Sequence, residues 1–120
     1  MDVNSNEVMA YVNLAEGMGR VRNNAKLFKR MLGMYLAGKE FAQMDDALAG
    51  GQLVEAADAA HAIKGMSGNL GLTAVFETST KMMNELRGGN FDQASYASYK
   101  DACVKTREIV EYLVNVHFAE

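Results

Sequence analysis

Apolar residues recur every three or four positions along most of this chain, and no proline interrupts them. This spacing places side chains on one face of an α-helix, which turns once in ~3.6 residues. Only 8% of the residues are aromatic, while alanine, leucine, methionine, glutamate and lysine are frequent, and this composition favours helix over strand. We therefore predict an all-α bundle of antiparallel helices joined by short turns. The pattern is cleanest near the C-terminus, at Tyr99, Ala102, Cys103, Thr106, Ile109, Val110, Leu113 and Val116.

Glycine and asparagine divide the chain into its helical segments. Glycine commonly follows the end of a helix, and a serine or asparagine side chain caps the beginning of one. Gly17, Gly38 and Gly50 mark expected ends, and Asn90 is expected to cap the last helix with Gln93 at the capping-box position. The predicted helices cover residues 5–16, 24–38, 39–49, 52–70 and 73–87, and a last one runs from residue 90 toward the C-terminus.

Length and charge narrow the class of protein. A chain of 120 residues can bury one self-sufficient core, so we predict a single domain over residues 1–120. The net charge of −3 provides no basic surface for a phosphate backbone, which disfavours nucleic-acid binding. Cys103 is the only cysteine, so an intrachain disulfide is excluded, and a buried apolar role is expected for it.

The N-terminus and the hydropathy pattern bear on location. The first residues, MDVNSNE, lack the basic start and apolar core of a signal peptide, and no apolar run approaches the ~20 residues of a membrane span. We expect a cytoplasmic protein without membrane contact, or a soluble part of a larger one. A monomer is expected, because no feature of the sequence requires self-association.

The helix predicted over residues 52–70 carries two distinct strips. At ~100° per residue, one strip gathers the core residues Leu53, Ala56, Ala57, Ala60, Ile63, Ser67 and Leu70. A second strip lies roughly 130° away and consists of Val54, His61, Gly65, Gly68 and Leu72, with Lys64 on its inner edge and Asp58 on its outer edge. His61 is therefore predicted to face solvent.

The two glycines of the second strip need an explanation. Each glycine in a helix interior costs about 1 kcal/mol relative to alanine. Gly68 lies near the predicted helix end, where fraying is one explanation, but Gly65 does not. The other explanation is that a partner or a phosphoryl group approaches the helix more closely than a Cβ atom would allow. On that interpretation Val54, Asp58, Gly65, Gly68 and Leu72 form a docking surface around His61.

These residue types suit phosphoryl chemistry. A histidine ring in water is largely neutral above pH ~6.5, and its free nitrogen is then a nucleophile. Lys64, one turn after His61, supplies a mobile positive charge for phosphoryl oxygens. The alternative is an ordinary helical histidine beside a solvated lysine. A nucleotide-binding loop at Gly65, Gly68 and Gly71 is disfavoured, since the P-loop ending is missing, and His61 and His117 lack the spacing of a metal site.

The stretch AHAIKG at residues 60–65, followed by SGNLG at 67–71 and MNEL at 83–86, resembles the histidine-containing phosphotransfer (HPt) domain of bacterial phosphorelays. The resemblance implies an up-and-down antiparallel four-helix bundle with additional short N-terminal helices. It also implies that His61 is phosphorylated, that Lys64 stabilises phosphoryl oxygens, and that Gly65 permits close approach.

The resemblance further implies the partners. They would be receiver domains, a hybrid histidine kinase or both, and the Mg²⁺ of aspartyl-phosphate chemistry would belong to the receiver. The chain itself would need neither a cofactor nor a metal, and would carry phosphate without binding ATP or phosphorylating itself.

One position departs from the family pattern. Several members place a glutamine on the next helix to hydrogen-bond the imidazole or the phosphoryl group, and Met83 occupies the matching position here. Methionine has no hydrogen to donate. Thr80, Asn84 or water are the candidates that would orient the ring instead.

Three functions follow from these observations. The first is a phosphorelay carrier that accepts a phosphoryl group on His61 from one receiver and passes it to another. The second is the phosphoacceptor domain of a larger histidine kinase. The third is a helical adaptor that docks a receiver without chemistry, in which case His61→Ala would leave partner binding intact.

Overall fold

The computed structural model describes residues 1–119, which contain helices and no strand. Glu120, the last residue of the predicted domain, lies outside the described residues. The all-α prediction is confirmed. The elements are α1 (Asn6–Met9), α2 (Leu14–Arg20), α3 (Ala25–Leu36), α4 (Glu40–Ala49), α5 (Leu53–Asn69), α6 (Thr73–Arg87), α7 (Gln93–Tyr112) and a short π-helix, η1 (Leu113–His117).

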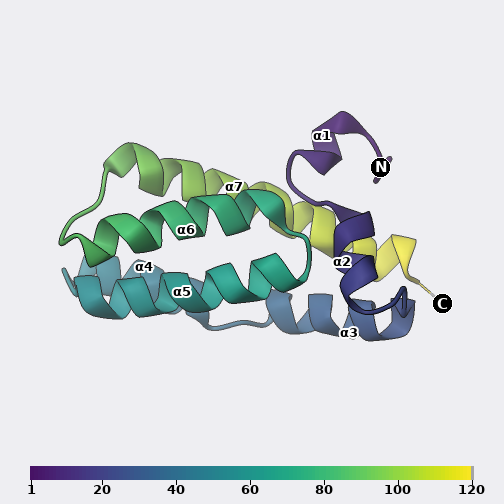
Figure 1. The fold of residues 1–120 in the computed structure, drawn as a ribbon, viewed down its shortest axis with the longest axis horizontal. Helices are drawn as coiled ribbons and strands as arrows, with labels where there is room; N and C mark the ends of the chain where they lie inside the picture. The colour runs from purple at the N-terminus through teal and green to yellow at the C-terminus, as the bar shows by residue number, and fades with distance from the viewer. Residues whose placement is uncertain (120) are drawn as a thin grey trace.

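The predicted four-helix bundle is formed by α4, α5, α6 and α7. α5 and α6 are an antiparallel pair at the front of Figure 1, with α4 behind α5 and α7 behind α6. Asp45 on α4 joins the bundle's first and last helices: its carboxylate accepts a hydrogen bond from the Tyr96 hydroxyl at 2.7 Å and from Lys100 Nζ at 2.6 Å. The four helices therefore close into a ring of neighbours.

Beyond the bundle, α3 continues the line of α4 along α7. Arg107 on α7 donates a hydrogen bond to the Leu36 carbonyl at 3.2 Å, and the rings of Phe28 and Phe118 meet edge to face at 5.9 Å. Residue numbers fall along α4 and α3 as they rise along α7 and η1, so the two lines run antiparallel. The molecule is elongated, measuring 44 × 25 × 21 Å (Figure 1).

Two apolar clusters fill the interior. One lies within the four-helix bundle and includes Met44, Ile63 and Met82, which are all fully buried. The other lies beneath α1, α2 and α3 and includes Phe28 and Val110. Full burial of one such side chain contributes about 1.5–3 kcal/mol, so both clusters hold the helices in place.

The N-terminal segment differs from the single helix predicted over residues 5–16. It contains α1, a turn, and then α2, which begins where the Asn13 side chain accepts a hydrogen bond from Glu16 N at 3.1 Å. The Asn13 backbone N–H donates to the Gly71 carbonyl at 2.8 Å and so fixes α2 to the turn between α5 and α6. Gly17 is a buried residue inside α2 and does not end a helix.

The last helix also begins later than predicted. Asp92, not Asn90, is the capping residue, and its side chain accepts a hydrogen bond from Ala94 N at 2.9 Å. Glu85 on α6 accepts hydrogen bonds from Asp92 N and the Ser95 hydroxyl, both at 2.7 Å. These two bonds lower the pKa of the Glu85 carboxyl and fasten α6 to the start of α7. The start of α7 at Asp92 is therefore stabilised by a contact with another helix, α6.

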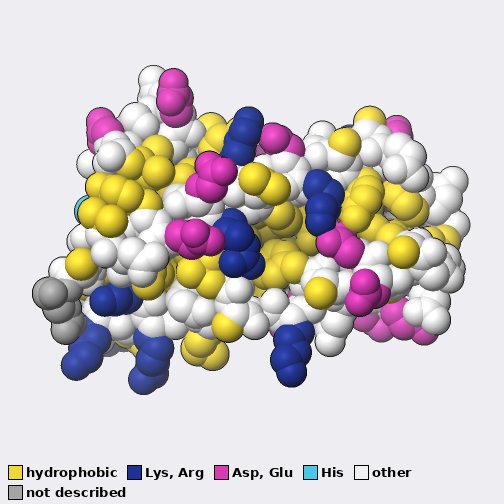
Figure 2. Space-filling view, turned by 180° about the vertical axis from the view of Figure 1, so that it is seen from behind, with side chains coloured by type: hydrophobic (Ala, Val, Ile, Leu, Met, Phe, Trp, Pro, Cys, Tyr) yellow, Lys and Arg dark blue, Asp and Glu magenta, His cyan; other side chains and the backbone are white. Residues whose placement is uncertain are grey.

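The surface seen from behind is mixed in charge. Figure 2 shows Lys and Arg side chains at the end of the molecule where α3 lies, and both carboxylates and further Lys and Arg side chains over the remainder of that face. A shallow groove between α3 and η1 lies at this basic end, lined in part by Lys26, Lys29 and Arg30. Within residues 1–119, no helix combines the length and apolar character needed to cross a membrane.

Candidate functional site

α5 presents a face of small residues to the interior. Ala56, Ala57, Ala60, Ile63 and Ser67 are buried, as the predicted core strip requires. The Ser67 hydroxyl donates to the Ile63 carbonyl at 2.8 Å, so the buried polar group is satisfied within its own helix. Small side chains let α6 and α4 pack closely against α5, and this packing sets which residues of α5 remain outside.

The second strip of α5 faces solvent over most of its length. His61, Gly65, Asp58 and Val54 are exposed, and Val54, at 73% exposed, is among the most exposed large apolar residues described. A Cβ atom built on Gly65 would meet no heavy atom within 4 Å. Packing within the chain therefore gives no reason for glycine at position 65.

Leu72 does not belong to this strip, contrary to the prediction. α5 ends at Asn69, and Gly71 turns the chain with a φ of +72°, a conformation that favours glycine. Leu72 then points into the second apolar cluster and is fully buried. The helical projection failed because it extended the helix across a turn.

Gly68 is close to the side chain of Phe76 on α6. A Cβ atom at position 68 would lie 2.9 Å from Phe76 Cδ1 and 3.1 Å from Cε1. The ring therefore packs directly on the backbone of α5. This contact explains the glycine by packing inside the chain, so the docking interpretation applies to Gly65 more strongly than to Gly68.

Lys64 is half-buried on the inner edge of the strip, and its side chain extends toward α6. Its Nζ atom lies 6.0 Å from the centroid of the Phe76 ring. None of the ion pairs found among residues 1–119 involves Lys64. The ammonium group is thus next to an aromatic face and is not neutralised by a carboxylate there.

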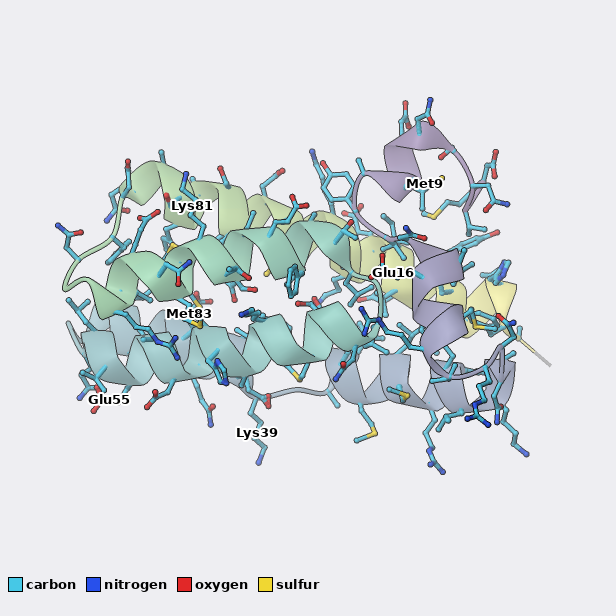
Figure 3. The ribbon with its side chains drawn as sticks, viewed as in Figure 1. Met9, Glu16, Lys39, Glu55, Lys81 and Met83 are labelled. Atoms are coloured by element: carbon cyan, nitrogen blue, oxygen red, sulfur yellow. The ribbon has the colours of Figure 1, made fainter. Side chains whose placement is uncertain are left out.

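Met83 and the two residues considered for orienting the imidazole in its place, Thr80 and Asn84, are in different settings. Met83 is 4% exposed, and Figure 3 shows its side chain in the space between α6 and α5. The Thr80 hydroxyl donates to the Phe76 carbonyl at 2.6 Å, which leaves its oxygen free only to accept a hydrogen bond. Asn84 is exposed and can both donate and accept.

Comparison with known families decides what kind of domain carries this site. A model of the Hpt domain matches residues 30–113, which is more than half of the chain. The chain belongs to the Hpt family. Hpt domains carry phosphoryl groups on histidine in two-component signalling and work with receiver domains and kinases. No curated protein and no solved structure matches the chain.

The matched range of the Hpt domain contains the whole of α4, α5, α6 and α7, and therefore all of the strip around His61. α1 and α2 lie outside this range. The other histidine of the chain, His117, lies beyond the matched range, in η1, with its ring edge-to-face against Phe118 at a centroid distance of 4.7 Å. Across residues 1–119, no group of three or more His, Cys, Asp or Glu residues is arranged to hold a metal ion.

Phe76 is the residue of the Hpt site that sequence reasoning missed. The sequence analysis assigns no role to Phe76, whereas the structure places it 37% exposed beside Gly68 and Lys64. A signal was present, since Phe76 lies about 90° from the centre of the strip formed by Val75, Ser79 and Met82. Phe76, and not Leu72, is therefore the large apolar residue that borders the exposed strip of α5 at Gly68.

Proposed function

We propose that this Hpt domain is a phosphorelay carrier in which His61 accepts a phosphoryl group from the aspartyl phosphate of one receiver domain and passes it to an aspartate of another. The exposed imidazole beside an unobstructed glycine is the observation that carries this proposal. A receiver must bring its aspartate to bonding distance of the ring, and an open surface at Gly65 allows that approach. We place the carrier in the cytoplasm and expect it to act as a monomer.

The proposed phosphoryl transfer changes no oxidation state and needs no external oxidant or reductant. A lone pair of the neutral His61 ring forms a P–N bond while the P–O bond of the aspartyl phosphate breaks, and the aspartate leaves as a carboxylate. The reverse reaction hands the phosphoryl group to the next receiver. Lys64 offsets negative charge on the phosphoryl oxygens. The Mg²⁺ ion that assists the chemistry belongs to the receiver, and the chain requires no cofactor of its own.

Docking is proposed to use the exposed residues around the imidazole. Val54 offers an apolar contact, and Asp58 offers a charge one turn before His61. Gly68 adds backbone surface, although Phe76 occupies one side of it. Asn84, or the oxygen of Thr80, is proposed to hold the ring in place of the glutamine that Met83 replaces.

A reconstituted relay tests the proposal. Receiver domains of the source organism are phosphorylated with acetyl phosphate in Mg²⁺, freed of the donor, and mixed with the chain and a second receiver. We expect acid-labile label on the chain and its onward transfer to the second receiver. His61→Gln is expected to abolish both without unfolding the bundle, because the side chain is exposed.

His117→Gln is the matched control and is expected to retain full transfer. If no receiver labels the parent chain, or if His61→Gln is labelled like the parent, the carrier proposal is wrong. Receiver binding that survives His61→Ala without any labelling of the parent would instead support the adaptor function.

A further inference from the structure

A groove lies at the end of the exposed strip of α5, where α2 meets the turn between α5 and α6. Its walls include Glu16 and Arg20 on α2, Gly68 on α5, and Thr73 and Phe76 on α6, and we call it the Phe76 groove. Figure 3 shows Glu16 where α2 lies beside that turn. The groove has a volume of about 130 Å³, close to the ~150 Å³ of a cavity that holds benzene, so it has room for one apolar side chain.

The Phe76 groove offers apolar surface on the side of α5 and α6 and charge on the side of α2. The ring of Phe76 is 37% exposed and packs on the bare backbone of Gly68, where a Cβ atom would lie 2.9 Å from Cδ1. On α2, Glu16 and Arg20 pair with each other at 3.3 Å, and about half of each side chain is exposed. An apolar side chain that enters the groove therefore buries its own surface and the open part of the ring.

The Phe76 groove is close enough to His61 to be covered by the same partner. Gly68 follows His61 by seven residues on the same face of α5, which at 1.5 Å per residue is about 10 Å along the helix. A protein interface of standard size covers about 800 Å² of each partner, equivalent to a circle of about 16 Å radius. A receiver domain centred on the imidazole would therefore extend over Gly68 and Phe76.

We propose that the Phe76 groove receives an apolar side chain of the receiver domain that docks over His61. This inference rests on the proposed function and deepens it, because it gives the same partner a second contact region, away from the reacting atoms. Continuity with the exposed strip of α5 and the open aromatic ring favour this occupant. Phe76 contributes to docking and does not touch the phosphoryl group.

Two phosphoryl donors separate docking from chemistry. Potassium phosphoramidate is a small donor without a protein surface: the His61 nitrogen forms a P–N bond while the P–N bond of the donor breaks and ammonia leaves. Phe76→Ala is expected to lower kcat/KM for transfer from a phosphorylated receiver roughly fivefold to thirtyfold, as for loss of an aromatic contact in an interface. The same variant is expected to react with phosphoramidate at the parent rate.

Two further variants make the comparison specific to the Phe76 groove. Thr73→Trp places a bulky ring on the wall of the groove and is expected to slow receiver-dependent transfer in the same way, without slowing the reaction with phosphoramidate. Val104→Ala is the matched control, since Val104 is 57% exposed on α7 and lies outside the groove, and it is expected to retain the parent rates. Circular dichroism checks that each variant is folded.

The proposal requires both Phe76→Ala and Thr73→Trp to slow receiver-dependent transfer, and an unchanged rate in either variant would overturn it. Equal slowing with phosphoramidate would also overturn it, because the defect would then lie at His61. A parent chain that dimerises in sedimentation experiments, and becomes monomeric with Phe76→Ala, would assign the groove to a second copy instead. If phosphoramidate labels His61 but no receiver does, the proposed function itself is wrong, and this inference is wrong with it.

Discussion

Gly65 and Gly68 lie one turn apart on α5 but have different surroundings. A Cβ atom at position 65 meets nothing within 4 Å, whereas one at position 68 meets the Phe76 ring. Gly65→Ala is therefore expected to raise the free energy of unfolding by up to about 1 kcal/mol, the helix propensity gained over glycine. Gly68→Ala is expected to fall short of that gain, because the ring must move.

Urea denaturation of the two variants measures this difference. If Gly65 serves close approach of a partner, Gly65→Ala also slows transfer from a phosphorylated receiver while it stabilises the fold. A Gly65→Ala protein that is both more stable and fully active would show that position 65 is not part of the docking surface.

Cys103 provides a prediction about pH. Burial raises the pKa of its thiol to about 11, so the neutral form dominates at pH 8. Because the thiolate is the reactive form, alkylation by iodoacetamide at pH 8 is expected to be at least about tenfold slower than for a small free thiol, and to accelerate as the pH rises toward 11. The same reaction in denaturing urea should lose this protection. A native rate that already levels off near pH 9 would contradict it.

At the scale of elements, the attachment of α2 depends on two glycines that face each other. Gly17 packs against the Leu70 carbonyl and lies so close to Phe28 that a Cβ atom would be 2.8 Å from Cε1. Gly71, with its positive φ, lies against Asn13 and Gly17. The two glycines thus allow backbone to approach backbone where α2 meets the turn after α5.

Substitution within α2 tests this attachment. Gly17→Ala is expected to lower the free energy of unfolding by about 1–3 kcal/mol, the usual cost of overpacking a buried site. Gly19→Ala is the matched control on the same helix, since a Cβ atom there meets nothing within 4 Å, and it should leave stability unchanged or slightly raised. Equal stability of the two variants by chemical denaturation would show that α2 can shift without cost.

The elements also show which signals the sequence carries. The limits predicted for α5 and α6 agree with the structure to within a residue or two, because their apolar periodicity is strong and glycines bound them. The break between α1 and α2 was missed because it is fixed by the hydrogen bond from Asn13 to Gly71, residues far apart in the chain. The cap at Asp92 was missed because Glu85 stabilises it from another helix.

At the scale of the whole molecule, periodicity predicted the class of fold, and the resemblance at residues 60–71 predicted the family. Neither predicted that α3 and α4 would share one line antiparallel to α7, an arrangement held by side chains such as Asp45 and Arg107. Within the site, the exposure of His61 followed from the helical projection of α5. The position of Phe76 beside Gly68 could not follow, since it depends on how α6 is rotated against α5.

The proposed carrier function depends on one bond between phosphorus and the ring of His61. The direct measurement is a ³¹P–¹H correlation spectrum of the chain after transfer from a phosphorylated receiver in Mg²⁺, with the histidine ring protons assigned by comparison with His61→Gln and His117→Gln. We predict one phosphorus resonance, coupled to the ring protons of His61 and lost on acidification. Phosphorus bound to His117 or to any other side chain, or a chain that no receiver phosphorylates, would contradict the proposed carrier function.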